Sequence, residues 1–224
     1  MSTRTTSTTK ISALDFHDRL IAEKGVEAAS GFSAHGRRTR FEIIARCLEQ
    51  FPLGVKLLDY GCNDGLLYDT LRRGFDLTAY TGMDINPQFI AWAKERLKDS
   101  TGCDKVTFTV GNIMEDATLK RIKRLAPDVI VASGILCYTE NASTYQEVVR
   151  RLFQHAKHGV ILNVLSTEAR TNIVNTKGVF RWSPERVLKA LRKSGCTSWE
   201  ILHSYIHNDM TVLLRKKWTH FVKP

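Results

Sequence analysis

The stretch VKLLDYGCNDG, residues 55–65, joins a short apolar run to a turn that contains two glycines. Residues 55–60 are mostly apolar and carry an acid, Asp59, near their end, which is typical of a buried parallel strand. Gly61 and Gly65 have no Cβ, so the backbone can turn tightly after this strand and approach a ligand closely. Ligands of open parallel sheets bind beyond the carboxyl ends of the strands, and this turn is therefore the first place to expect a site.

Segments with strand and helix character alternate along the chain from this point. Strands are predicted at 55–60, 77–84, 105–110, 127–135, 159–166, 198–205 and 210–217, and helices at 66–73, 86–97, 118–125, 144–156 and 183–195. The last two strands follow each other without a helix between them, so they should pair antiparallel. This order indicates an α/β sheet with helices on both faces.

The segment before the first strand has a different character. Residues 1–10 are nearly all small, polar or basic, and they are predicted to form a disordered tail. Helical patterns follow, and no internal repeat or linker interrupts the rest of the chain. We therefore expect a single domain over 11–224, in which 11–53 form an N-terminal helical cap and 54–217 form the core.

Composition narrows the class of protein only in part. The 224 residues include 33 Lys and Arg against 23 Asp and Glu, a formal charge of +10 that would attract nucleic acid, anionic lipid or acidic substrates. Basic stretches such as 120–124 and 215–217 lie on separate predicted elements with few aromatic residues between them, which favours solvated faces. No stretch approaches the ~20 apolar residues of a membrane helix.

The five cysteines are widely scattered and form no CxxC pair, which argues against a disulfide framework and against a metal site. Reduced thiols are typical of a cytoplasmic protein, and the N-terminus has no apolar segment of the kind that a secretory signal needs. We therefore predict a cytoplasmic protein without a membrane partner and without a bound metal.

The end of the second predicted strand carries a second acid, Asp84, 23 residues after Gly61. A carboxylate at this position can accept hydrogen bonds from both hydroxyls of a ribose. A dinucleotide would also require the turn GxGxxG, but Asn63 and Leu66 occupy the positions of its middle and last glycines. The pattern therefore argues against NAD or FAD.

Four segments together resemble the class I S-adenosylmethionine-dependent methyltransferases. LLDYGCNDG (57–65) resembles the first motif of that superfamily, and GMDINPQFI (82–90) resembles the second. GNIMED (111–116) corresponds to the loop on the adenine side, and DVIVASGILCY (128–138) to the fourth motif. The resemblance implies a Rossmann-like seven-stranded sheet in the order 3-2-1-4-5-7-6, with strand 7 antiparallel, and S-adenosylmethionine as the cofactor.

The same resemblance implies a set of cofactor-binding residues. They are Asp59, Gly61, Cys62, Asn63, Gly65, Asp84, Ile85, Asn112, Ile113 and Ser133. Asp59 is expected to organise the loop amides and the ammonium of the cofactor. Asn63 replaces the central glycine of the loop. Asn112 stands where the superfamily often has an aspartate that accepts from the adenine amino group, and an amide oxygen can accept the same bond.

The sequence gives fewer signals for the residues that bind the methyl acceptor. We predict Arg40 and Tyr138 as substrate-binding residues. Tyr138 could contact an acceptor or simply pack at the rim of the site, and the arginines at 37, 38 and 40 could meet a carboxylate or form an exposed basic face. His17, His35, His207 and Asp209 are further candidates between which the sequence does not choose. No catalytic residue is assigned, because methyl transfer from a sulfonium needs alignment, and a base only when the nucleophile is protonated.

Three functions follow from these observations. The leading one is methyl transfer to an O or N atom of a small or medium-sized acceptor. The second is a nucleic-acid methyltransferase, which the basic charge favours, although ASGIL stands where many enzymes that methylate bases or glutamine carry an NPPY-type tetrapeptide. The third is a cofactor-binding protein without activity that serves as a partner, which the intact Asp59, Gly61 and Asp84 argue against. The sequence leaves the oligomeric state open.

Overall fold

The computed structural model describes residues 12–29, 33–98, 106–138, 141–168, 179–203 and 205–216, and the predicted tail at 1–10 lies outside these ranges. The strands are β1 (Val55–Tyr60), β2 (Leu77–Asp84), β3 (Val106–Val110), β4 (Val129–Ser133), β5 (Gly159–Leu165), β6 (Ser198–His203) and β7 (Asp209–Arg215). The α-helices are α1 (Ala13–Lys24), α2 (Ala34–Leu48), α3 (Leu66–Leu71), α4 (Pro87–Arg96), α5 (Asp116–Leu125), α6 (Ala142–His155) and α7 (Pro184–Lys193), and the short 3₁₀ helices are η1 (Val26–Ala28) and η2 (Leu136–Tyr138).

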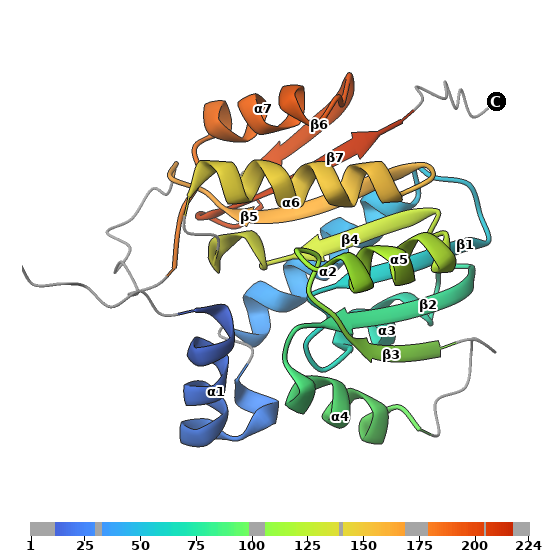
Figure 1. The fold of residues 1–224 in the computed structure, drawn as a ribbon, viewed down its shortest axis with the longest axis vertical. Helices are drawn as coiled ribbons and strands as arrows, with labels where there is room; N and C mark the ends of the chain where they lie inside the picture. The colour runs from blue at the N-terminus through green and yellow to red at the C-terminus, as the bar shows by residue number, and fades with distance from the viewer. Residues whose placement is uncertain are drawn as a thin grey trace, which may run out of the picture.

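The strands form one seven-stranded sheet in the order β3-β2-β1-β4-β5-β7-β6 (Figure 1). β1 to β5 are parallel, whereas β7 runs antiparallel to both β5 and β6, so the predicted order and the reversed last strand are confirmed. The chain builds outward from β1 to β3 and then crosses to β4 on the other side of β1. The carboxyl ends of β1, β2 and β4 therefore meet where the direction of the strand order changes, which is where open sheets bind ligands.

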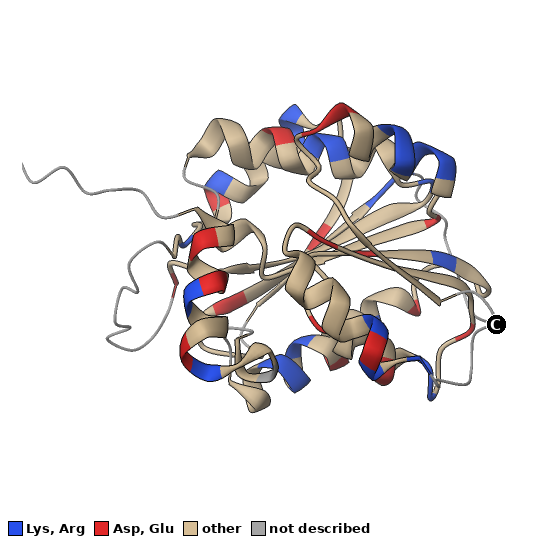
Figure 2. Cartoon of the chain, turned by 60° about the horizontal axis from the view of Figure 1, so that its bottom comes forward, with Lys and Arg blue, Asp and Glu red and all other residues tan. Residues whose placement is uncertain are grey.

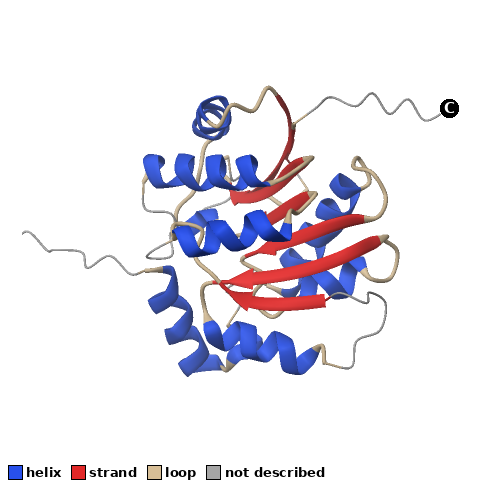
Figure 3. Ribbon diagram, turned by 45° about the vertical axis from the view of Figure 1, so that its right-hand side comes forward, coloured by secondary structure: helices blue, strands red, loops and turns tan. Residues whose placement is uncertain are grey.

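Each face of the sheet has its own hydrophobic core. On one face, buried side chains of α5, α6 and α7 such as Ile122, Val149 and Val187 pack against the sheet. On the other face, α2, α3 and α4 supply residues such as Ile44 and Leu67. The prediction of helices on both faces is confirmed, and Figure 3 shows these two layers of helices with the strands between them.

Local capping explains why the helices begin where the sequence indicates. The Asn86 side chain accepts from the N–H of Gln88 at 2.8 Å, and Pro87 fills the first position of α4. The fourth strand was predicted over 127–135, but β4 ends at Ser133. Gly134 has φ 73°, which turns the chain out of the sheet and into η2.

The N-terminal helices α1 and α2 precede β1 and differ in how they pack. α2 buries Ile44, Cys47 and Leu48 against the sheet, whereas no residue of α1 is fully buried. Figure 1 shows α1 beside the edge at which β1, β2 and β3 end. Among the described helices, none has both the length and the apolar character that a bilayer-spanning segment requires.

Candidate active site

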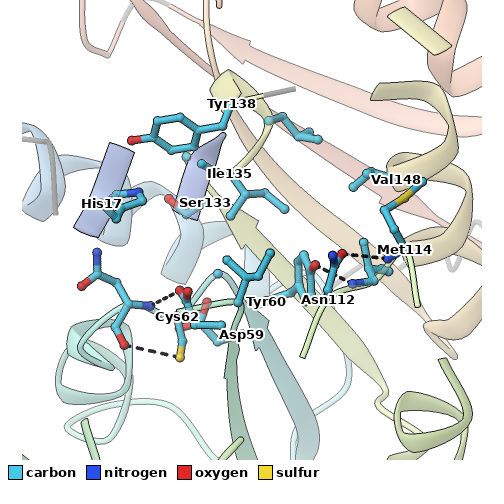
Figure 4. Close-up of a pocket in the computed structure, with 18 of the residues that line it drawn as sticks. His17, Asp59, Tyr60, Cys62, Asn112, Met114, Ser133, Ile135, Tyr138 and Val148 are labelled. Atoms are coloured by element: carbon cyan, nitrogen blue, oxygen red, sulfur yellow. Dashed lines mark hydrogen bonds between the residues drawn. The ribbon is translucent and has the colours of Figure 1, made fainter. Parts of the chain in front are cut away.

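A cavity of about 460 Å³ lies at the carboxyl ends of β1, β2 and β4, with α1 and α2 forming part of its wall. Its lining includes nine of the ten predicted cofactor residues, namely Asp59, Gly61, Cys62, Asn63, Asp84, Ile85, Asn112, Ile113 and Ser133, and both predicted substrate residues, Arg40 and Tyr138. The tenth, Gly65, lies behind the loop as the N-cap of α3 with φ 75°. Figure 4 shows His17, Ser133 and Tyr138 on one side of the cavity and Asn112 and Met114 on the other.

Gly61 opens the loop after β1 and has no room for a side chain. Its φ is 82°, and a Cβ built on it would lie 2.0 Å from Cγ2 of Ile135. The N–H groups of Gly61 and Cys62 both donate to the carbonyl oxygen of Met83, at 2.7 and 3.1 Å. These two bonds tie the loop to the end of β2, so the backbone itself forms the floor of the cavity at this point.

Asn63 stands at the position of the central glycine and adopts a backbone conformation that a glycine would also allow. Its φ is 51°, the left-handed region that asparagine adopts more readily than most residues. Its N–H donates to Oδ2 of Asp84 at 2.9 Å. Its side-chain Oδ1 is buried and, within the described part of the chain, has no hydrogen-bond partner. A group that can donate a hydrogen bond is therefore missing beside this loop.

Asp84 lies at the end of β2 and holds two segments together. One oxygen accepts from Asn63 N–H and the other from Asn86 N–H, each at 2.9 Å. A carboxylate has about four acceptor positions, so lone pairs are left for hydroxyl donors. Burial raises the pKa of Asp84, although the two backbone N–H groups oppose this rise.

Asp59 at the end of β1 is almost completely buried and accepts from the Tyr80 hydroxyl at 2.6 Å. The sequence predicted that Asp59 would organise the loop amides, but among the described residues Met83 and Asp84 accept those N–H groups. Burial raises the pKa of Asp59 to about 7, and the nearby carboxylates of Asp84 and Asp64 add to the effect. Three carboxyl groups close together and poorly hydrated favour a cationic ligand.

This raised pKa predicts how stability depends on pH. The folded protein holds the Asp59 proton more tightly than the unfolded chain, in which the pKa is near 3.8. The free energy of unfolding should therefore fall as the pH rises from about 4 to about 7, by at most about 1.4 kcal/mol per pH unit from this group. Urea unfolding at pH 5 and pH 8 should show a smaller decrease for Asp59→Asn than for the wild type. An equal decrease in both proteins would contradict the prediction.

The adenine side of the cavity contains one residue that the sequence did not reveal. The hydroxyl of Tyr60 accepts from the N–H of Ile113 at 2.8 Å and so fixes the loop that follows β3. Oδ1 of Asn112 accepts from Met114 N–H at 3.0 Å, so the oxygen predicted to meet adenine already closes a turn and has one lone pair left. In the sequence, the only sign of this role was that Tyr60 directly follows Asp59 at the end of the strand. Because the side chains of neighbouring strand residues point to opposite faces of the sheet, that sign was weak.

The opposite side of the cavity is aromatic. Tyr138 of η2 lies 5.3 Å from the ring of Phe16 and 5.1 Å from the ring of His17, measured between ring centroids. His17 also contacts Phe89 of α4 at 5.2 Å. We call this group, together with Ser133, the Tyr138 end of the cavity. Among the histidines that the sequence left open, His17 lines the cavity, whereas His35 and His207 do not.

Arg40 reaches the cavity wall from α2, but its guanidinium is paired with Asp209. Nε and Nη2 both donate to the Asp209 carboxylate, the latter at 3.2 Å, and the two residues are 5% and 0% exposed. Asp209 is the first residue of β7, so the pair connects the N-terminal helices to the terminal hairpin. The charge of Arg40 is already balanced inside the protein, which leaves it less able to attract an acidic acceptor.

Comparison with known proteins supports one class. A family model described as a methyltransferase domain matches residues 58–162. A comparison with curated protein sequences finds no significant match.

Among solved structures, the magnesium protoporphyrin IX methyltransferase of Synechocystis PCC 6803 with bound SAH is similar, with a TM-score of 0.61, 13% identity, and coverage of 81% of this chain and 84% of that one. The methyltransferase domain of bacterial CtHen1-C matches with a TM-score of 0.66, 17% identity, and coverage of 80% and 97%. The CurJ carbon methyltransferase matches with a TM-score of 0.61, 18% identity, and coverage of 79% and 52%.

Three findings together indicate the class of protein. They are the sheet order, the glycine loop beside Asp59 and Asp84, and the match to a methyltransferase domain. Residues 58–162 match a methyltransferase domain, and the chain has the fold of the class I S-adenosylmethionine-dependent methyltransferases, so S-adenosylmethionine is the cofactor that this domain and fold use. The cavity fits this group: the backbone of Gly61 and Cys62 lines it, Oδ1 of Asn63 has no donor among the described residues, and the carboxyl groups of Asp59, Asp64 and Asp84 suit a cofactor with a sulfonium and an ammonium.

Proposed function

We propose that this methyltransferase acts on an O or N atom of a small or medium-sized acceptor bound at the Tyr138 end of the cavity. When bound, S-adenosylmethionine supplies an electrophilic methyl group. The observation that carries the proposal is the Tyr138 end, where aromatic rings and Ser133 lie beside α1 and the nearby Arg40 is paired with Asp209. Such a concave, mostly apolar pocket suits a small molecule better than a phosphate backbone.

The cofactor would occupy the remainder of the cavity. Asp84 would accept from the ribose hydroxyls, and the backbone of Gly61 and Cys62 would contact the methionine moiety, with Asp59 and Asn63 beside the ammonium. On the adenine side, Asn112 and Ile113 would contact the base. The residues with these roles are Asp59, Gly61, Cys62, Asn63, Gly65, Asp84, Ile85, Asn112, Ile113 and Ser133, with Tyr138 and, less directly, Arg40 beside the acceptor.

The basic residues that favoured a nucleic-acid substrate lie away from this cavity. Lys123 and Arg124 are in the last turn of α5, and the N–H of Lys216 donates to His158 just before β5 begins. Helices antiparallel to the strands end where the strands begin, so these charges lie at the edge opposite the cavity. Figure 2 shows Lys and Arg spread over helices on both sides of the sheet. Phosphate contacts there would not bring a base to the Tyr138 end.

The proposal includes a cytoplasmic location. Cys47, Cys62, Cys137 and Cys196 are free thiols, a state that the reducing cytoplasm maintains.

A labelling experiment tests the proposed acceptor class. The protein is incubated with S-adenosylmethionine labelled at the methyl group and with cell extract separated into small-molecule, protein, RNA and DNA fractions. We expect label in the small-molecule fraction. Label confined to RNA or DNA, together with binding that survives ~150 mM salt, would replace this proposal by the nucleic-acid alternative. A lack of label in every fraction, with SAH bound, would favour a partner without activity.

The role of Asp84 gives a separate prediction on affinity. Asp84→Ala should weaken SAH by ~2 kcal/mol or more, about 30-fold, because hydrogen bonds to a charged group contribute about 1.5–3 kcal/mol and the loop anchor at Asn63 is lost as well. Calorimetric titration measures the change. Asp76→Asn is the control. Asp76 is exposed and lies just before β2, so this variant should bind SAH as the wild type does. A less than twofold effect of Asp84→Ala would show that the ribose binds elsewhere.

A further inference from the structure

Methyl transfer to a protonated O or N atom releases a proton, and the cavity contains few groups that could accept it. Asp59, Asp64 and Asp84 line the part of the cavity proposed to hold the cationic cofactor, and Cys62 is a buried thiol whose pKa burial raises well above its usual value. Burial also raises the pKa of the phenols Tyr60 and Tyr138, so neither is a base at neutral pH. His17 is the one imidazole among the described residues that line the cavity.

A backbone contact determines the protonation of the His17 ring. Nδ1 lies 3.1 Å from the carbonyl oxygen of Ala29, which is fully buried. A carbonyl can only accept, so Nδ1 carries the hydrogen and donates it, and Nε2 keeps its lone pair. The two ring nitrogens point to different sides of the ring. Because Nδ1 is engaged with Ala29, Nε2 is the nitrogen of this cavity-lining ring that remains to act as a base.

The neighbours of His17 suit a base that becomes charged. Desolvation lowers the pKa of His17, so the ring is neutral at pH 7. The carboxylates of Asp84 and Asp18 lie close enough to favour the imidazolium electrostatically. Phe89 and Tyr138 contact the ring edge to face and hold its plane. His17 lies at the Tyr138 end, on the side of the cavity away from Asn112 and Met114 (Figure 4).

We propose that His17 is the general base of the methyl transfer, with Nε2 taking the proton of the acceptor. This inference rests on the proposed O- or N-acceptor. As the acceptor atom forms its bond to the methyl carbon, the bond between that carbon and the sulfonium sulfur breaks, and the electron pair stays on sulfur. The proton of the acceptor passes to Nε2, and the imidazolium later releases it to solvent. Ala29, Asp18 and Asp84 position and stabilise the ring.

The first test uses the labelled-methyl assay on whichever fraction the wild type labels. His17→Gln keeps a polar side chain of similar size but has no basic nitrogen, so the rate at pH 7 should fall about 100-fold or more. The wild-type rate should also decline toward acid pH as one group protonates, and this decline should be absent from the residual rate of the variant. His35→Gln, on an exposed position outside the cavity, should match the wild type.

Two measurements that need no acceptor complete the test. The SAH affinity and the melting temperature of His17→Gln should stay close to those of the wild type, which separates loss of the base from loss of the fold or the cofactor site. Long-range ¹H–¹⁵N spectra of histidine-labelled protein should show hydrogen on Nδ1 of His17. A hydrogen on Nε2, or a variant rate within threefold of the wild type, would overturn the assignment. Label in nucleic acid with a slow His17→Gln variant would refute the small acceptor and retain the base.

Discussion

Gly61→Ala should weaken SAH at least 100-fold and lower the melting temperature. The added methyl would lie 2.0 Å from Cγ2 of Ile135, and the φ of 82° is strained for alanine. Overpacking costs about 1–3 kcal/mol and a left-handed non-glycine residue about 1–2 kcal/mol, so a total near 3 kcal/mol is expected. Since the loop must move to relieve the overlap, much of this cost should appear in binding, where 2.7 kcal/mol corresponds to about 100-fold.

Two further variants show whether the geometry at Gly61 is responsible for the expected loss of SAH affinity and stability. Gly74→Ala is the control, because a Cβ there meets nothing within 4 Å and the backbone is not left-handed; it should change neither affinity nor stability appreciably. Ile135→Ala in the Gly61→Ala background removes the clashing atom and should restore part of the affinity, leaving the cost of the backbone conformation. If Gly61→Ala binds SAH as the wild type does, the cofactor does not approach this loop closely.

Arg40→Ala should destabilise the protein by about 3–5 kcal/mol. The substitution leaves the Asp209 carboxylate without its partner at a position that is 0% exposed, and an uncompensated buried charge has a cost of this size. The same substitution removes the ion pair that links α2 to the terminal hairpin. Denaturant unfolding gives the free energy, and we expect a decrease in melting temperature of several degrees.

A double substitution separates the buried charge from the loss of contact. Arg40→Met combined with Asp209→Leu replaces the pair by apolar groups and should recover most of the stability lost in either single variant. The exposed pair between Lys98 and Glu95 is the control, and Lys98→Ala should cost less than about 1 kcal/mol. A cost below 1 kcal/mol for Arg40→Ala would mean that water compensates the Asp209 charge.

The sheet and the loop above it could be predicted from local patterns. The apolar run 55–60 marks β1, Asn86 and Pro87 mark the start of α4, and the absence of a helix before 210 marks the reversed strand. These signals act over a few residues, through backbone preferences and side-chain periodicity, and therefore appear in the sequence itself. Gly61 and Asp84 could be predicted as site residues for the same reason, because Gly61 directly follows β1 and Asp84 ends β2.

The partners of the other site residues depend on how distant segments pack. Arg40 and Asp209 are 169 positions apart, and their pairing makes Arg40, a predicted substrate residue that lines the cavity, also part of a buried link between α2 and β7. Tyr60 meets Ile113 across 53 positions, and His17 reaches the cavity only because α1 packs beside α4 and η2. Local sequence patterns determined the fold and the cofactor loop of this protein. Tertiary packing decided which charges are neutralised and which imidazole lines the cavity, because those properties depend on contacts between surfaces that form only in the folded chain.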